Sequence, residues 1–374
     1  MKIGIISFSS AGEKLAKRLE SGLKAVYKEA EINNVCKSEY ACSKLEISHD
    51  LWTKQRFNDS DAIIFIGACG IAVRSISPYV KSKKTDPAIV VIDDCGKFSI
   101  PLLSGHLGGA NELAKLAAEI SGATAAVTTA TDNHGKLSPD LFAKKNNCEI
   151  GSFVKAKELA AWLLEENTCA IYSEFDMDTA KIPSEVKLIN TADVSKPEIS
   201  KGIYISVCDG EIPKSQKQVE GNETCDWLKL IPRAAYVGIG CKRGTNAEAI
   251  QEAFEDALKR CNLDRRAVAA ICSCDIKKNE TGLVEFCRNN KLKFITFSSD
   301  ELMSMEGDFT PSEFVKSVTG TDNVCERSAA AGCIKAADDD IDNDKSEYEI
   351  ILRKLCSNGV TCAVAVRRWR ISFE

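Results

Sequence analysis

The sequence predicts an α/β protein, with an open parallel sheet in an N-terminal domain, a small α/β middle domain and a C-terminal α/β domain. Short apolar strands alternate with amphipathic helices near both ends of the chain, a pattern typical of parallel sheets covered by helices. The chain has 374 residues, too many for one ordinary hydrophobic core. We therefore expect domains over residues 1–138, 139–230 and 231–374, with residues 139–230 including a linker.

The N-terminal elements follow from apolar periodicity. Strands are expected at residues 2–8, 61–67, 88–92 and 123–128. The helix after the first strand carries leucines four residues apart on one face, and Ser10 and Glu13 have the spacing of a capping box. A second helix is expected to follow Gly109 and to stop at Gly122, because glycine commonly ends helices.

The middle region is less regular, and we expect its polar residues to be structural. A helix is predicted at 156–164, strands at 169–172 and 203–207, and a polar loop at 214–224.

In the C-terminal domain, further strands are predicted at 235–240, 268–272, 293–297 and 360–366. Thr245 and Glu248 have the spacing of another capping box. The acidic run Asp338–Asp344 is expected to be a solvated loop.

Composition excludes several classes of function. The formal net charge is −5, so no global basic field favours nucleic acid as a partner. No apolar run reaches the length of a membrane span, and the N-terminus does not resemble a signal peptide. The 17 cysteines are odd in number and contain no CxxC pair, which favours reduced, buried thiols over disulfides or a zinc site. We expect a cytoplasmic protein with no metal site of its own.

The strongest functional signal is the stretch Ser104-Gly-His-Leu-Gly-Gly-Ala-Asn111, which places three glycines around His106, one of only three histidines. Thr128-Thr-Ala-Thr-Asp132 follows the next predicted strand. Backbones that approach a ligand closely need such small residues. Ligands of open α/β sheets bind at the carboxyl ends of the strands, so we expect these segments to meet there. The residues predicted to bind substrate at this edge are Gly67, Gly70, Arg74, Ser104, Gly105, Gly108, Gly109, Asn111, Thr129 and Thr131.

Two side chains are the candidates for acid–base chemistry. The unperturbed pKa of histidine is near neutrality, so His106 can act as a general base or acid; the alternative is a hydrogen-bonded anchor for its loop. Asp132 can orient a water molecule or His106, or it can cap the next turn. Ser104 is a possible nucleophile, but no G-x-S-x-G elbow surrounds it, so we favour water as the nucleophile.

The C-terminal part contains a glycine-rich basic turn, Gly238-Ile-Gly-Cys-Lys-Arg-Gly244. Its spacing does not fit a dinucleotide fingerprint, but a basic turn before a helix suits an anion. Lys242 and Arg243 are therefore predicted to contact ligand, with exposure to solvent as the alternative. Glu326 lies in Cys325-Glu-Arg327, which we predict to be a second ligand-facing turn.

Together these motifs resemble those of the cobalt-precorrin-5A hydrolase (CbiG) family of anaerobic cobalamin biosynthesis. The N-terminal resemblance includes Gly67–Arg74, Ser104–Asn111 and Thr128–Asp132. The C-terminal resemblance includes Gly238–Thr245, Lys277-Lys-Asn-Glu280 and Gly359–Ala365. The middle region matches only weakly, and the acidic run Asp338–Asp344 departs from the pattern.

The resemblance implies a hydrolase acting on carbon–carbon bonds. Such an enzyme opens the ring-A δ-lactone of cobalt-precorrin-5A and releases acetaldehyde to give cobalt-precorrin-5B. The resemblance carries over no catalytic residues; our hypothesis for this chain is that His106 or Asp132 is the general base and that the N–H groups of Gly108 and Gly109 stabilise the oxyanion. No cofactor is expected, because the substrate carries the cobalt. The expected partners are this tetrapyrrole and, transiently, other enzymes of the pathway.

Two other classes remain open at this stage. The same turns would suit a non-catalytic corrinoid-binding or carrier protein of the pathway. A sugar-phosphate or nucleotide enzyme is the third class, disfavoured by the absence of a Walker motif and of a well-spaced dinucleotide fingerprint.

Overall fold

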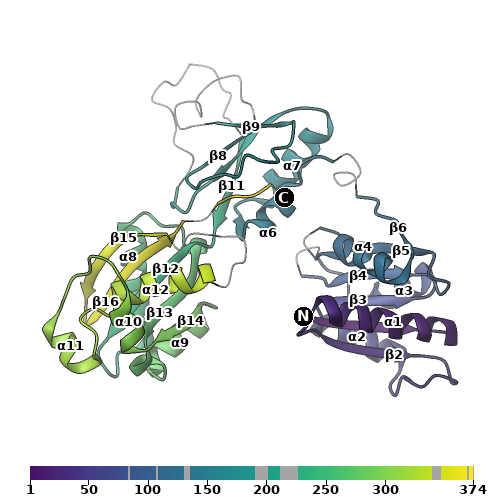
Figure 1. The fold of residues 1–374 in the computed structure, drawn as a ribbon, viewed down its shortest axis with the longest axis horizontal. Helices are drawn as coiled ribbons and strands as arrows, with labels where there is room; N and C mark the ends of the chain where they lie inside the picture. Colours follow the sequence, from purple (N-terminus) through teal and green to yellow (C-terminus); the bar gives the residue numbers. More distant parts are fainter. Residues whose placement is uncertain are drawn as a thin grey trace. The chain divides into compact units, whose positions relative to one another are not determined.

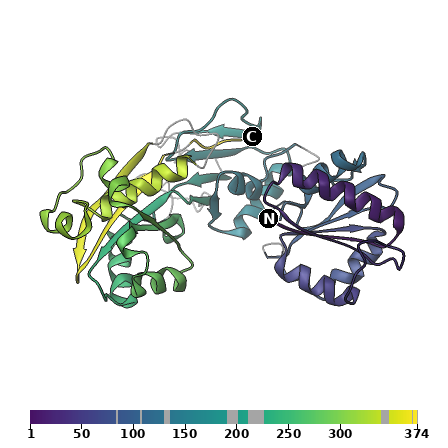
Figure 2. The ribbon, with the colours of Figure 1, turned by 60° about the horizontal axis from the view of Figure 1, so that its bottom comes forward.

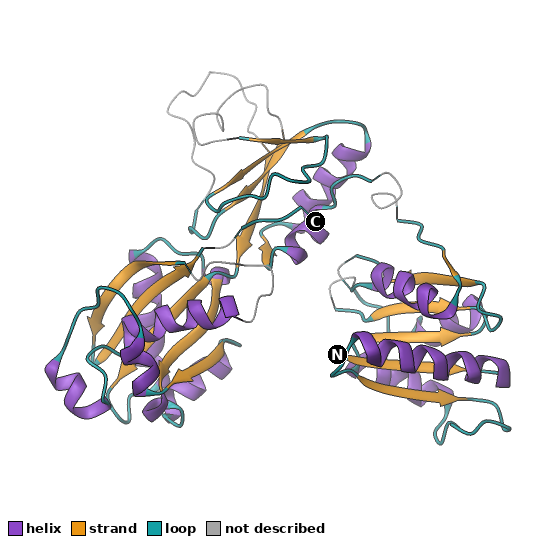
Figure 3. Cartoon of the chain, viewed as in Figure 1, coloured by secondary structure: helices purple, strands orange, loops and turns teal. Residues whose placement is uncertain are grey.

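The computed structural model describes residues 1–82, 85–106, 108–129, 135–189, 201–210, 226–338, 347–368 and 370–373. The chain forms two compact units, Met1–Leu141 and Phe142–Glu374. The first unit contains one sheet and the second contains two, each accompanied by helices (Figures 1 and 3). The predicted α/β class is confirmed. The division into three domains stays a prediction.

The sheet of the first unit has six strands in the order β2-β1-β3-β4-β5-β6. The strands are β1 (Lys2–Ser7), β2 (Glu31–Cys36), β3 (Ala62–Ile66), β4 (Ala88–Ile92), β5 (Phe98–Leu103) and β6 (Thr124–Ala125). The first four strands in the sheet order are parallel. β5 runs antiparallel to β4, and β6 runs parallel to β5. The sequence did not predict β2 or β5, and β6 is shorter than expected.

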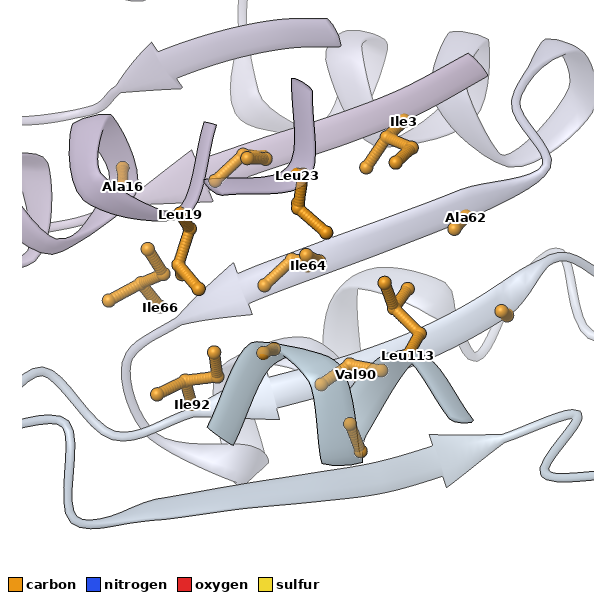
Figure 4. Close-up of a cluster of buried hydrophobic side chains, with 14 of the residues drawn as sticks. Ile3, Ala16, Leu19, Leu23, Ala62, Ile64, Ile66, Val90, Ile92 and Leu113 are labelled. Atoms are coloured by element: carbon orange, nitrogen blue, oxygen red, sulfur yellow. The ribbon is translucent and has the colours of Figure 1, made fainter. Parts of the chain in front are cut away.

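Helices cover both faces of this sheet, as the alternating pattern predicts. They are α1 (Ser10–Val26), α2 (His49–Asp59), α3 (Cys69–Ile76) and α4 (Ala110–Ser121). On one face, Leu19 and Leu23 of α1 and Leu113 of α4 pack against Ile64 and Val90 (Figure 4). Figure 2 shows α1, in purple, crossing that face. On the other face, α2 and α3 pack against the alternate residues of the same strands. The strands are therefore buried on both sides, which explains their continuous apolar sequences.

The predicted capping box of α1 is wrong by one residue. Ser9, in an extended conformation, is the N-cap, and its Oγ accepts a hydrogen bond from the Gly12 N–H at 3.0 Å. Glu13 instead reaches a distant loop. Its carboxylate accepts hydrogen bonds from the backbone N–H groups of Cys42 and Ser43, both at 3.0 Å.

The second unit contains two five-stranded sheets. The first, in the order β7-β11-β10-β8-β9, contains β7 (Cys148–Ile150), β8 (Cys169–Ser173), β9 (Val186–Leu188), β10 (Lys201–Ile205) and β11 (Asp226–Pro232). The second, in the order β14-β13-β12-β16-β15, contains β12 (Ala235–Cys241), β13 (Val268–Cys274), β14 (Lys293–Phe297), β15 (Tyr348–Ser357) and β16 (Val360–Arg367). The remaining α-helices among the described residues are α6 (Pro139–Lys145), α7 (Phe153–Leu164), α8 (Ala247–Arg260), α9 (Thr281–Asn289), α10 (Ser299–Ser304), α11 (Glu313–Thr319) and α12 (Cys325–Asp338).

The predicted capping box of α8 is wrong by one residue. Asn246, not Thr245, is the N-cap of α8, and its side chain accepts a hydrogen bond from the Ala249 N–H. The loop at 214–224 lies outside the described residues, as does the acidic run beyond Asp338. Among the helices that the structure describes, none is long and apolar enough to cross a membrane.

Candidate active site

A tight turn between β4 and β5 decides where the glycine-rich loop around His106 lies. The Asp93 carboxylate accepts hydrogen bonds from the N–H groups of Cys95 at 3.0 Å and Lys97 at 2.8 Å, and also from Phe98. Gly96 completes the turn with a φ of 68°. The segment Asp93–Gly96 is therefore a self-capped hairpin turn, and the chain returns along β4 in the opposite direction, with Ile89 opposite Leu103.

Because of this reversal, the His106 loop lies where β1, β3 and β4 begin. The prediction that all the motifs meet at the carboxyl ends of the strands is therefore wrong. Ser104 Oγ donates a hydrogen bond to the carbonyl of Asp86, just before β4, at 3.0 Å. Because β6 runs parallel to β5, the segment after β6 heads for the same edge. There, Asn111 Nδ2 donates to Thr129 Oγ1 at 3.0 Å.

The loop is held by its own backbone. The N–H groups of Ala110 and Asn111, at the start of α4, donate to the carbonyls of Ser104 and Gly105 at 3.1 and 3.0 Å. The N–H of Gly109 donates to the His106 carbonyl at 3.0 Å. These donors are thus engaged within the loop. The Gly109 N–H therefore does not serve as an oxyanion donor in this structure, contrary to expectation.

Two of the predicted glycines are required by close packing. A Cβ on Gly108 would lie 2.4 Å from the Ser104 Cβ and 2.7 Å from the Ser104 carbonyl oxygen. A Cβ on Gly105 would lie 2.7 Å from Asn111 Oδ1. Gly109 has a φ of 84°, in the left-handed region that favours glycine. The glycines shape the loop that presents His106.

His106 lies beside two polar residues that sequence reasoning missed. Its Nδ1 is 3.3 Å from Ser138 Oγ and 3.4 Å from Asp140 Oδ1. Ser138 Oγ also forms a short hydrogen bond to Asp140 Oδ1. The side chains of His106 and Asp140 are 14% and 15% exposed, so the group is mostly shielded from solvent. A signal was present, since Ser138-Pro-Asp140 has the composition of a helix start, and Pro139 is the first residue of α6.

Asp132 and Thr131 lie outside the described residues. Their predicted roles as alternative base and substrate contact therefore stay predictions.

Gly67, Gly70 and Arg74 lie at the opposite, carboxyl edge of the same sheet. β3 and β4 have five residues each, which at about 3.3 Å per residue separates the two edges by about 17 Å. The Gly67 N–H donates to the Ile92 carbonyl at 2.8 Å. Arg74 is exposed, and its Nη1 donates to the Gly70 carbonyl at 3.2 Å. These residues do not join the His106 group.

The basic turn of the second unit already holds a carboxylate from the chain itself. The Gly244 N–H donates to Glu280 Oε1 at 2.7 Å, and Lys277 Nζ donates to Glu280 Oε2 at 2.9 Å. The Lys277 hydrogen bond, followed by that of Gly244, lowers the pKa of Glu280. Lys242 and Arg243 are exposed on the same turn. The turn is thus suited to anions, with these two cations on its surface.

Glu326 is fully buried at the start of α12. Its carboxylate accepts hydrogen bonds from the N–H and Oγ1 of Thr310, at 2.8 and 2.9 Å, and from the Lys354 N–H at 2.7 Å. Gly238 is also structural, because a Cβ there would lie 1.8 Å from the Cys325 carbonyl oxygen. These contacts favour a structural role for Glu326 over the predicted contact with ligand.

Comparison with known proteins places both ends of the chain in one family. The family model described as Cobalamin synthesis G N-terminal matches residues 51–132, and the model described as Cobalamin synthesis G C-terminus matches residues 235–365. A cobalamin biosynthesis protein G homolog from Sulfolobus solfataricus, of solved structure, is 25% identical and covers 98% of this chain and 97% of its own, with a TM-score of 0.39.

Two curated relatives are named cobalt-precorrin-5A hydrolase. The protein from Priestia megaterium is 31% identical over 73% of this chain and 73% of its own length. The protein from Salmonella typhimurium is 33% identical over 72% of this chain and 76% of its own length. At these identities over most of each chain, and with both family models matched, this chain belongs to the cobalt-precorrin-5A hydrolase (CbiG) family.

Proposed function

We propose that this protein is a cobalt-precorrin-5A hydrolase, which opens the ring-A δ-lactone of its substrate and releases acetaldehyde to give cobalt-precorrin-5B. The names of the curated relatives support the substrate. The observation that carries the site is the His106 imidazole, which the glycine-rich loop presents beside Ser138 and Asp140.

In the proposed reaction, His106 accepts a proton from a water molecule as the water oxygen attacks the lactone carbonyl. The carbonyl carbon–oxygen bond of the lactone then breaks as protonated His106 returns its proton to the leaving oxygen. This leaves a carboxylic acid on ring A and a free hydroxyl on the two-carbon fragment. That hydroxyl loses its proton as the carbon–carbon bond to the macrocycle breaks, and the fragment leaves as acetaldehyde. The bonding electron pair stays on the conjugated macrocycle, so the proposal includes no cofactor beyond the cobalt in the substrate. Asp132 is the alternative base.

Five of the remaining predicted residues are assigned to binding. Asn111 and Thr129, joined by a hydrogen bond beside the loop, offer polar groups near His106, and the Gly108 N–H is the proposed oxyanion donor. Arg74, Lys242 and Arg243 are exposed cations that can pair with the many carboxylates of a precorrin.

The proposal places the reaction in the cytoplasm. The cysteines that the structure describes are free thiols, which suits a reducing compartment. Transient contact with other enzymes of the pathway is part of the proposal, since each would pass on a corrinoid intermediate.

The direct test is to incubate the purified full chain with cobalt-precorrin-5A under anaerobic conditions. Acetaldehyde is measured by its reduction with alcohol dehydrogenase and NADH, and the corrinoid product by mass spectrometry. We expect one acetaldehyde per cobalt-precorrin-5A consumed, with heat-denatured protein as the control. Corrinoid binding without acetaldehyde would favour a carrier. The absence of both corrinoid binding and turnover would contradict the proposal.

A further inference from the structure

The three side chains of this group, His106, Ser138 and Asp140, come from two segments of the first unit. His106 belongs to the loop before α4, whereas Ser138 and Asp140 flank the first residue of α6. Ser138 is 32 positions after His106 in the sequence, yet the two side chains are in contact. Both acceptor oxygens, Ser138 Oγ and Asp140 Oδ1, face the same ring nitrogen, Nδ1.

The donors and acceptors of this group determine where the histidine proton lies. The Ser138 hydroxyl has a single hydrogen, and the strong short contact to Asp140 uses it. Asp140 is acceptor-only when ionised, and its Oδ1 also accepts the Leu141 N–H at 3.1 Å. Ser138 Oγ can therefore only accept from His106, as can Asp140. Nδ1 must be the donor, and in neutral imidazole the lone pair then lies on Nε2.

We propose that Asp140, with Ser138, is a positioning residue that holds His106 with its proton on Nδ1, so that Nε2 is the basic nitrogen presented to the reaction. The inference rests on the proposed function, in which His106 removes a proton from water. A carboxylate on the far nitrogen of a catalytic imidazole selects the tautomer and stabilises the imidazolium that forms.

The same geometry argues against Ser138 as a nucleophile activated by His106. An activated serine donates its hydrogen to the histidine. Here the contact to Asp140 is much shorter than the 3.3 Å between Ser138 Oγ and His106 Nδ1, so the hydroxyl hydrogen lies toward the carboxylate. Ser138 therefore connects Asp140 to His106 and does not attack the substrate.

The test combines NMR with kinetics on the full chain. Only three histidines are present, so long-range ¹H–¹⁵N spectra of labelled protein can be assigned with a His106→Gln variant. We expect the Nδ1–H tautomer for neutral His106 in the wild type, and its loss in Asp140→Ala. The kcat of acetaldehyde release should fall at least about tenfold in Asp140→Ala with little change in KM, and less in Ser138→Ala, which keeps the carboxylate.

A matched control exists at the other described histidine. Asp50 Oδ1 lies 3.7 Å from His49 Nδ1, but Asp50 is 92% exposed. Asp50→Ala should leave the His106 signals and turnover unchanged. If Asp140→Ala does not fold, the wild-type tautomer and Ser138→Ala still decide the question.

The outcomes separate this inference from the proposed function. An Nε2–H tautomer in the wild type, an unchanged tautomer in Asp140→Ala, or a complete loss of turnover in Ser138→Ala alone would overturn it. If the wild type shows the Nδ1–H tautomer but releases no acetaldehyde, the proposed function fails, and with it the catalytic part of the inference, while the assignment of the proton stands.

Discussion

Among single residues, Glu13 shows how one carboxylate organises the first unit. It accepts the N–H groups of Cys42 and Ser43 and the Ser43 hydroxyl, and it pairs with Lys17 at 3.1 Å. The backbone hydrogen bond from Ser43, followed by the one from Lys17, lowers the pKa of Glu13 from 4.5 to about 2. The ionised form is therefore the one that holds the loop onto α1.

The pH dependence of this contribution has a definite sign. Because the pKa of Glu13 is lower in the folded state, its stabilisation is complete above pH 4.5 and is lost as the pH falls toward 2. Glu13→Gln should lower the stability of the first unit at pH 7. Between pH 5 and 2, the variant should then lose less stability than the wild type does. Urea denaturation across this range measures the effect, and Glu29→Gln, at an exposed turn residue, is the control. Equal pH profiles for wild type and Glu13→Gln would contradict the assignment.

At the candidate site, local sequence predicted the loop but not its partners. The glycines around His106 are visible because Gly105 and Gly108 lie within a few residues of the atoms that exclude a Cβ. Ser138 and Asp140 approach His106 only through the fold of the intervening chain, and the domain boundary predicted after residue 138 placed Asp140 in another domain. Short motifs report local backbone geometry, and they do not report such distant pairings.

At the scale of elements, the hairpin between β4 and β5 changes the interpretation of the site most. The helix–strand alternation predicts parallel neighbours, and it placed the loop at the carboxyl edge. The contrary signal was Asp93-Asp-Cys-Gly96 between two apolar runs, since short connections that contain glycine often join antiparallel strands.

This hairpin gives an element-scale prediction. Asp93→Ala removes the acceptor for three backbone N–H groups and should lower the free energy of unfolding of the first unit by about 1 kcal/mol, as for loss of a helix cap. Asp94→Ala is the matched control, because Asp94 is exposed and its only described contact in that turn is a weak one to the Cys95 thiol. Chemical denaturation measures both, and equal stabilities would show that Asp93 does not hold the turn.

For the molecule as a whole, distant segments join the two sheets of the second unit. Cys208 pairs with Leu263 in an isolated β-bridge. The Asn146 side chain donates a hydrogen bond to the carbonyl of Ser372, 226 positions later in the sequence. No local pattern indicates such contacts. The apolar runs predicted most strands, because burial on both faces is visible in sequence, but which sheets share one compact unit depends on these long-range links.

Asp264 provides the test of this connection. Its side chain is 5% exposed and contacts Lys229 of β11 at 3.3 Å and Arg266 at 2.8 Å. Burial alone would raise the pKa of Asp264, but the hydrogen bonds from Arg266 outweigh it and lower the pKa. Asp264→Asn should lower the free energy of unfolding by about 1–3 kcal/mol, because Lys229 loses a charged partner in a shielded position.

Hydrogen exchange can follow the two sheets separately in this variant. We expect β11 and β13 to lose protection together in Asp264→Asn. Asp256→Asn, which removes a surface pair with Arg260, should change stability by less than about 1 kcal/mol. Loss of protection in β11 alone would mean that the two sheets unfold independently.

The central claim is that His106 performs the proton transfer that opens the lactone. The most direct measurement is the rate of acetaldehyde release from cobalt-precorrin-5A by His106→Ala, compared with wild type, Asp132→Ala and the control His49→Ala. Loss of a general base typically costs about a hundredfold or more, so His106→Ala should be slowed to that extent while it still binds the corrinoid, and His49→Ala should match wild type. Near-wild-type release by His106→Ala would contradict the account, and a large loss in Asp132→Ala alone would transfer the role to that residue.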